Sequence, residues 1–257
     1  MLPLRQLAAR WLEQLASTVF DMLKSTSLLL VTAIVAFAAG LHVASFTAMG
    51  ELLPELLRGV RITVLVALGG SLVAMVMALL AGLAKLYAPR PLRWLAVAYI
   101  ETFRGTSALV QLFWLFFVLP HFGITLSPMT VGIVALGLNV GAYGAEVVRG
   151  AIGGVARGQW EAAQALNMTH TQALRRIVLP QAFVAMIPPW GNLLIELLKA
   201  TSLVSLITLS DLTFKAQQVN QNTLRTVEVF SLVLLMYLAL SVLITVGTRA
   251  LERKVKG

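Results

Sequence analysis

Hydrophobic residues occur along this chain in unbroken runs, and short polar, charged or proline-containing segments separate the runs. The hydrocarbon layer of a membrane is roughly 30 Å thick, and a helix crosses it with about 20 apolar residues. Six runs meet that length. The pattern therefore predicts an all-α integral membrane protein with about six transmembrane helices, at residues 27–46, 62–84, 95–119, 129–148, 183–208 and 229–248.

Composition supports a membrane location. Of 257 residues, 58% are hydrophobic and 12% are charged, and the charged share is about half that of a soluble domain. The net charge of +9 comes from bases scattered at segment ends, so it favours a phospholipid surface and argues against nucleic acid. The absence of cysteine excludes disulfides, cysteine-ligated zinc and thiol nucleophiles.

The first 26 residues are too long and too acidic, with Glu13 and Asp21, for the basic start of a typical signal peptide. We therefore expect the first apolar run to be a retained anchor.

The distribution of Lys and Arg predicts the orientation of the spans. Fourteen of these bases fall in the termini and in alternate connections that must share one side. The opposite connections hold four, namely Arg58, Arg61, Lys215 and Arg225. Cytoplasmic segments carry the excess of positive charge. Both termini and the segment 149–182 are therefore expected in the cytoplasm.

Residues 161–182, EAAQALNMTHTQALRRIVLPQA, are polar and helix-favouring, unlike the runs around them. Residues 161–166 favour a helix, and Asn167 tolerates the left-handed conformation that ends one. Thr169 and Gln172 have the spacing of a capping box, and a second helix is expected to end at Leu179-Pro180. The sequence predicts two short helices that lie at the cytoplasmic surface.

The spacing of this segment resembles the EAA signature of binding-protein-dependent ATP-binding-cassette importers, E-A-A-x3-G-x9-I-x-L-P. Its fixed positions are occupied by Glu161, Ala162, Ala163, Ile177, Leu179 and Pro180, and Asn167 stands in place of the glycine. In that family the segment is the coupling element that seats on the ATPase. A solvated polar loop is the alternative that composition alone leaves open.

Three further segments are similar to the polar amino-acid permease branch: residues 103–120, 141–152 and 197–207. Together the similarity covers about residues 56–250. It implies a five-span type I importer domain at residues 51–257, preceded by a leader and an extra span at residues 1–50.

The resemblance implies a permease subunit in a bacterial inner membrane. Its expected partners are ATPase subunits, a second permease that is identical or a sister chain, an extracytoplasmic solute-binding protein and the lipid bilayer. No G-x-x-x-x-G-K-[ST] phosphate loop occurs. We therefore expect no cofactor on this chain, with ATP and Mg bound by the partner ATPase.

Other function classes find less support. A secondary transporter would need inverted repeats and leaves the EAA spacing unexplained. The histidines His42, His121 and His170 are scattered and lie in no HExxH motif, so neither a catalytic nor a metal site is expected. A purely structural assembly protein remains an alternative that would tolerate changes at Glu161.

Charged and polar residues within spans suggest a transport pathway, because charge is costly in a bilayer. Three acid–base pairs are spaced by three residues, which allows an ion pair within one helix: Glu196 and Lys199, Glu146 and Arg149, and Glu101 and Arg104. The motif IPPWGN at 187–192 predicts a broken helix beside a polar cavity. The pathway residues predicted from this are Asn192, Glu196, Lys199, Thr201 and Ser202.

Two features have both a packing and a functional interpretation. Gln111 and Asn139 either face the pathway or bond to neighbouring helices, and the glycine pair Gly137 and Gly141 permits close helix packing. Residues 209–230 should form the outer connection, as a surface for the binding protein or as a simple polar loop.

Within the branch, GQWEAAQALNM and DLTFKAQQVNQ look most like the ectoine and hydroxyectoine importer permeases. Many amino-acid permeases have an acidic residue where this chain has Ala200, which suits a zwitterion without a free amine. The expected substrate is therefore ectoine or hydroxyectoine. The alternative is a polar amino acid of the glutamine, glutamate, histidine or arginine type.

Overall fold

The computed structural model describes residues 46–256, and every regular element within that range is a helix. Four helical segments are long and apolar enough to cross a membrane, at Gly50–Tyr87, Pro128–Gly153, His170–Ile207 and Thr226–Val255. A bent pair of helices at 90–122 provides up to one more. The predicted spans at 62–84, 129–148 and 229–248 lie within helices, whereas the first predicted span, 27–46, falls almost wholly outside the described residues.

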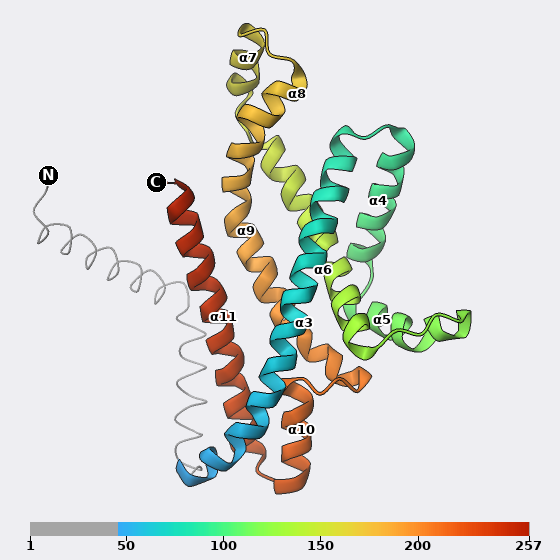
Figure 1. Ribbon diagram of the computed structural model, residues 1–257, viewed down its shortest axis with the longest axis vertical. Coiled ribbons are helices and arrows are strands. Elements are labelled where there is room, and N and C mark those ends of the chain that lie inside the picture. The colour runs from blue at the N-terminus through green and yellow to red at the C-terminus, as the bar shows by residue number, and fades with distance from the viewer. Residues whose placement is uncertain (1–45, 257) are drawn as a thin grey trace, which may run out of the picture.

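The long helices run side by side between two ends of the molecule (Figure 1). They are α3 (Phe46–Tyr87), α6 (Pro128–Gly153), α9 (Leu179–Ala200) and α11 (Thr226–Lys256). The short helices α7 (Arg157–Ala165) and α8 (His170–Ala173) project at one end, which we name the hairpin end. Helix α10 (Leu212–Thr223) lies at the opposite end, the α10 end.

Helices α3 and α6 pack closely because α6 presents glycines to α3. A Cβ atom added at Gly137 would lie 2.6 Å from Cβ of Val73, and one at Gly141 would lie 3.1 Å from the carbonyl oxygen of Ala74. Neither site has room for a side chain. Small residues at this spacing bring helix backbones together in lipid, so the expected close packing at the glycine pair is confirmed.

The predicted span at 95–119 is wrong as a single helix. Helix α4 (Arg90–Gly105) ends at Thr106, and the following segment, α5 (Ala108–Phe113) with its continuation to Phe122, bends away by 106°. Thr106 and Ser107 have extended backbone torsions, which break the helical hydrogen bonding. The continuation comprises a π-helical turn, η1 (Trp114–Val118), and a 3-10 turn, η2 (Leu119–Phe122).

The predicted break at IPPWGN is also misplaced. Helix α9 passes through Pro188 and Pro189 without interruption and changes only at its end into a 3-10 helix, η4 (Thr201–Ile207). Thr208, with φ of 64°, ends η4. Helices in a bilayer tolerate proline where neighbouring helices, polar side chains or local adjustments of the helix satisfy the backbone groups that it frees. Here α11 approaches so closely that a Cβ at Gly191 would lie 2.9 Å from Thr248.

The connection at the α10 end is a helix rather than a simple loop. Asp211 is the N-cap of α10, and its carboxylate accepts from the backbone N–H groups of Phe214 at 2.9 Å and Thr213 at 3.2 Å. The N–H of Leu212 donates to the hydroxyl of Thr63 on α3 at 3.1 Å. These bonds fix α10 against the N-terminal half of α3.

Candidate functional site

The α7–α8 hairpin is held by a regular helix stop. Asn167 has a φ of 53°, the left-handed conformation expected from the sequence. Its N–H donates to the carbonyl of Gln164 at 2.9 Å, and the N–H of Met168 donates to the carbonyl of Ala163 at 3.1 Å. This pair of bonds is the Schellman motif, which satisfies the last carbonyls of α7.

The start of α8 is equally well defined. The hydroxyl of Thr169 accepts from the N–H of Gln172 at 3.3 Å, and the side chain of Gln172 accepts from the N–H of Thr169 at 2.9 Å. Both bonds of the predicted capping box are present. The turn between α7 and α8 is therefore fixed by its own sequence.

The EAA alanines have different surroundings. Glu161 and Ala162 are exposed, whereas Ala163 is buried inside the hairpin, as is Ala173 of α8. Ala163 thus permits close packing of α7 within this chain. Glu161, Ala162 and the tip residue Leu166 are left on the surface of the hairpin.

The second helix of the hairpin does not end at Leu179-Pro180, which corrects that prediction. Helix α8 passes through a π-helical turn, η3 (Leu174–Val178), directly into α9. The N–H of Leu179 bonds to the carbonyl of Leu174, five residues back. Pro180 lacks an N–H, and this wider turn lets the helix continue past it. The hairpin is consequently continuous with a long apolar helix.

Three of the predicted pathway residues share one face of α9. Asn192, Glu196 and Lys199 are spaced by four and three residues and are all exposed. At 1.5 Å per residue, Asn192 lies about 20 Å along α9 from its start. An exposed polar stripe at that depth is costly in lipid, so it marks a face that water or another chain covers. We name Asn192, Glu196 and Lys199 the α9 stripe.

Thr201 and Ser202 are placed differently. Thr201 is fully buried, and its hydroxyl donates to the carbonyl of Leu198 at 2.6 Å. Ser202 is half-buried and donates to the carbonyl of Lys199 at 2.8 Å. Thr201 therefore does not reach the α9 stripe. The pairing expected between Glu196 and Lys199 is also wrong, because no ion pair joins them within the described range.

Gln111 and Asn139 bond to the break between α4 and α5. The amide of Asn139 donates to the carbonyl of Phe103 at 3.0 Å and to the side chain of Gln111 at 3.1 Å. Gln111 in turn donates to the carbonyl of Phe103 at 3.0 Å and to the hydroxyl of Thr106 at 2.6 Å. The structure therefore favours the helix-bonding interpretation of these two amides over the pathway one.

Arg104 has a position that the sequence did not predict. It is exposed beside the break, and its guanidinium lies 5.4 Å from the ring centre of Tyr143. The predicted pair with Glu101 is absent from the described ion pairs. The chain bends directly after Gly105, and the sequence pattern did not predict that bend.

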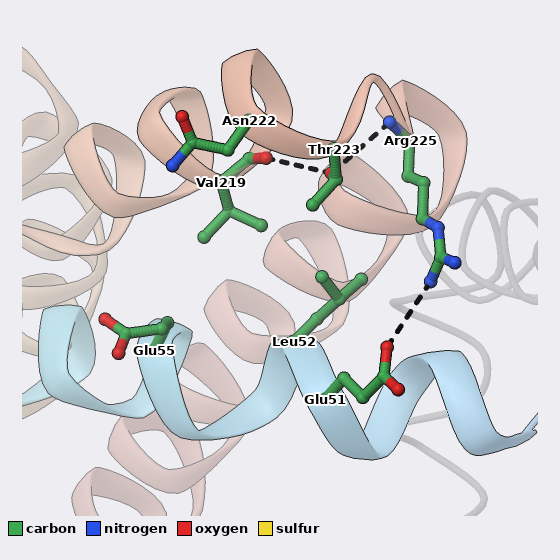
Figure 2. Close-up of a pocket in the computed structure, with 7 residues that line it drawn as sticks. All are labelled: Glu51, Leu52, Glu55, Val219, Asn222, Thr223 and Arg225. Atoms are coloured by element: carbon green, nitrogen blue, oxygen red, sulfur yellow. Dashed lines mark hydrogen bonds and ion pairs between the residues drawn. The ribbon is translucent and has the colours of Figure 1, made fainter.

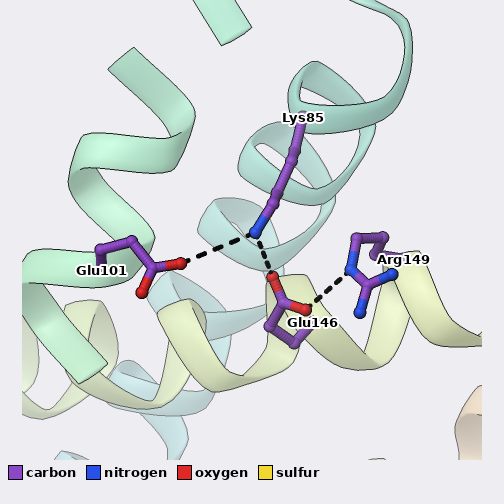
Figure 3. A network of polar contacts seen from close by, with 4 residues as sticks. All are labelled: Lys85, Glu101, Glu146 and Arg149. Atoms are coloured by element: carbon purple, nitrogen blue, oxygen red, sulfur yellow. Dashed lines mark hydrogen bonds and ion pairs between the residues drawn. The ribbon is translucent and has the colours of Figure 1, made fainter. Parts of the chain in front are cut away.

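A cluster of charges ties α3, α4 and α6 together (Figure 3). Glu146 accepts from Lys85 at 2.7 Å and from Arg149 at 2.7 Å, which confirms the expected pair within α6. Lys85 also lies 3.8 Å from Glu101. Lys85 of α3 joins Glu146 of α6 and Glu101 of α4, so this cluster has a structural role.

The α10 end carries a shallow cleft of about 430 Å³ (Figure 2). It is lined by Glu51, Leu52, Glu55, Val219, Asn222, Thr223 and Arg225. Arg225 lies 3.9 Å from Glu51, and Glu55 accepts from Arg58 at 2.7 Å. Both acids are therefore already paired with bases.

Comparison with known proteins identifies the family. Residues 70–257 match the binding-protein-dependent transport system inner membrane component family. Over 180 residues the chain is 49% identical to a probable amino-acid ABC transporter permease protein, y4tF, of Sinorhizobium fredii, covering 68% of this chain and 76% of the relative. The L-cystine transport system permease protein TcyB of Bacillus subtilis is 42% identical over 66% of this chain and 73% of its own length.

A solved structure agrees with the sequence comparison. The crystal structure of an amino acid ABC transporter with histidines superposes with a TM-score of 0.77 at 33% identity, covering 82% of this chain and 99% of that one. The all-helical arrangement is thus that of a type I importer permease. This chain belongs to the binding-protein-dependent transport system inner membrane components, as a permease subunit of an ABC importer.

Proposed function

We propose that this permease imports a polar amino acid and that the α7–α8 hairpin receives the motion of an ATPase subunit. The observation that carries the proposal is the hairpin itself. It projects from the helices (Figure 1), its turn is fixed by a Schellman motif and a capping box, and it continues into α9 without a flexible joint. A rigid projection of this kind transmits a displacement into the membrane-spanning helices.

The distribution of bases supports a cytoplasmic hairpin end. The hairpin end carries Lys85, Arg90, Arg93, Arg149, Arg157, Arg175, Arg176, Arg249, Arg253 and Lys254. Among residues 46–256, the bases at the α10 end are Arg58, Arg61, Lys215 and Arg225. With the positive side inside, the hairpin and the C-terminus face the cytoplasm, and α10 faces the side from which a solute-binding protein delivers substrate.

The pathway that we propose follows the α9 stripe. A second permease chain, identical or sister, would cover this face and enclose water beside it. Glu196 supplies a carboxylate for an ammonium group. Lys199, on the same face, supplies positive charge for a carboxylate. Such a set suits a zwitterion, and Thr201 is better assigned to the core.

A polar amino acid fits this chain better than ectoine. Relatives named for an amino acid, for L-cystine and for histidines support the amino-acid alternative, and none of these names supports ectoine. The alanine at position 200 also no longer supports ectoine. Its side chain packs against the buried cluster around Val204 and Leu136 rather than on the α9 stripe.

Uptake of labelled substrates tests the proposal. The permease is reconstituted in vesicles with its ATPase and binding protein, and cystine, glutamine, histidine, arginine and ectoine are compared. We expect ATP-dependent uptake of one of the amino acids and none of ectoine. Uptake of ectoine alone would overturn the substrate class, and uptake that continues with an inactive ATPase would overturn the ATP-driven mechanism.

The hairpin is tested by Glu161→Lys. Glu161 is exposed, so the substitution leaves the fold intact and reverses one charge at the proposed ATPase contact. We expect uptake to fall at least tenfold, since truncation of a charge pair at an interface costs about 2 kcal/mol or more. Glu51→Lys, a reversal at an exposed carboxylate of the α10 end, serves as the comparison. Equal uptake in wild type and Glu161→Lys would remove the coupling role.

A further inference from the structure

Three aromatic rings meet where the hairpin joins the rest of the molecule. The ring of His170 stacks on Trp160, with 5.0 Å between centroids and 15° between planes. Its other contact is Tyr87, whose ring lies edge-on at 5.9 Å and 60°. The rings come from three elements, because Trp160 is on α7, His170 begins α8 and Tyr87 ends α3. We name these three residues the ring clamp.

Local structure determines where the middle ring lies. The capping box makes His170 the first residue of α8, and the left-handed Asn167 reverses the chain just before it. This turn brings His170 beside Trp160, which is half-buried and packs on the cluster around Val178 and Ile152. Tyr87 is on the surface, and its ring meets the hairpin at His170.

We propose that His170 is a positioning residue that couples the hairpin to α3. The inference rests on the proposed role of the hairpin as the ATPase contact and extends it. The hairpin continues into α9 through the backbone, and an apolar cluster that includes Leu86 and Trp160 joins it to α3. The ring clamp adds a contact at the C-terminal end of α3 and holds that end to the hairpin when the ATPase displaces it.

Helix α3 is suited to carry such a displacement to the far side of the membrane. It is a single helix of 42 residues, and its outer part lies against the start of α10. A Cβ added at Gly59 would lie 2.7 Å from the carbonyl oxygen of Asp211, so the two backbones touch. A displacement of α3 at Tyr87 is therefore transmitted to the α10 end, where substrate is delivered in the proposed orientation.

The test compares two replacements of similar size, His170→Phe, which keeps a planar ring, and His170→Leu, which does not. Substrate imported per ATP hydrolysed is measured in vesicles holding the whole transporter. We expect the Phe variant to match wild type and the Leu variant to lose about fivefold, the factor to which one aromatic pair corresponds. His121→Leu, an exposed histidine on η2 at a distance from the hairpin, serves as the control.

A distance measurement reports on the clamp directly. Because the chain has no cysteine, spin labels can be placed at Arg90→Cys, three residues after Tyr87 at the start of α4, and at Thr171→Cys next to His170 in the sequence, both exposed positions. With His170 or Phe the label distance should stay narrow with and without ATP. With Leu it should broaden, because α8 then loses its ring contact with the end of α3.

The outcomes separate this inference from the proposed function. If wild type imports an amino acid and the Phe and Leu variants have equal import per ATP and equally narrow label distances, the ring clamp has no positioning role. If the Leu variant alone loses coupling and shows the broad distribution, the inference holds. Failure of wild type to import any amino acid concerns the proposed substrate and leaves the label comparison to decide the clamp.

Discussion

Asn167 occupies a backbone conformation that favours glycine, and the family signature has glycine at this place. A φ of 53° costs a residue with a side chain roughly 1 kcal/mol relative to glycine. Asparagine lowers that cost because its short polar side chain tolerates the left-handed region. The turn therefore accepts Asn167 with some strain.

Replacement of Asn167 tests that argument. We expect Asn167→Gly to keep uptake and to slow cleavage of the hairpin by protease, because the strain is relieved. Asn167→Val should speed cleavage and lower uptake, since a β-branched residue is the least suited to a positive φ. Both variants are compared with wild type in the purified transporter. Equal cleavage in all three would contradict the role given to this conformation.

Asp211, which lies outside the spans, has a buried carboxyl with a shifted pKa. Burial raises the pKa of its carboxyl to about 6 from an ordinary value of 3.8, against the N–H groups of Phe214 and Thr213, which lower it. The folded form then holds a proton more tightly than the unfolded chain. The contribution to stability is complete below the unfolded pKa and is lost as the pH rises through about 6.

The upward shift of the Asp211 pKa predicts how stability depends on pH. We expect the free energy of unfolding in detergent to fall between about pH 4 and pH 6 by no more than about 3 kcal/mol. Asp211→Asn keeps the N-cap but cannot titrate, so its stability should lack this slope. Glu51→Gln, at an exposed carboxylate of the same end, is the control. An unchanged slope in Asp211→Asn would show that another group titrates.

At the scale of elements, the break between α4 and α5 depends on two side-chain amides. Asn139 on α6 and Gln111 on α5 supply donors to the carbonyl of Phe103, which the extended torsions of Thr106 and Ser107 leave outside the helical ladder. In lipid an unpaired carbonyl is costly. The bend is therefore stable because Asn139 of α6 donates a hydrogen bond to the carbonyl of Phe103.

Two asparagine replacements should have different effects, one on stability and the other on uptake. Asn139→Leu should lower the free energy of unfolding by about 1–3 kcal/mol, because buried polar partners lose a donor. Asn192→Leu, on the exposed α9 stripe, should leave the thermal midpoint in detergent unchanged and reduce uptake. Thermal unfolding and uptake are measured for both. A loss of stability in Asn192→Leu comparable to that in Asn139→Leu would remove the distinction between a structural and a pathway amide.

At the scale of the whole molecule, the exposed surface is of two kinds. Leu243 on α11 is 68% exposed and belongs to an apolar face that lipid can cover. The α9 stripe is exposed as well, yet it is polar. The difference predicts that one face meets lipid and the other a water-containing space shared with a second permease.

Single cysteines distinguish the two faces. We expect Asn192→Cys in the assembled transporter to react with a charged, water-soluble maleimide, at a rate that changes when ATP is added. Leu243→Cys should react slowly with or without ATP, because lipid excludes the reagent. Similar slow reaction at both sites would place the α9 stripe in lipid or in a dry interface and would contradict the proposed pathway.

Much of the hairpin and of the span pattern was predictable from sequence. Three apolar runs are helices, and the stop at Asn167 and the capping box at Thr169 form as expected, because each depends on neighbours a few residues away. The expectation that proline ends or breaks a helix was wrong twice, at Pro180 and at Pro188. The π-helical turn and the neighbouring packed helices compensate for the missing N–H. Local rules do not include such tertiary compensation.

The sequence by itself determined the membrane location, the family and the turn chemistry of the hairpin, because hydrophobic length, motif spacing and capping are properties of short segments. Only the tertiary structure decided that Ala163 and Thr201 face the core, that Gln111 and Asn139 bond to a bent helix, and that Tyr87, Trp160 and His170 meet. These facts depend on which helices lie side by side. Contacts between residues far apart in the chain follow from packing, and no local pattern records them.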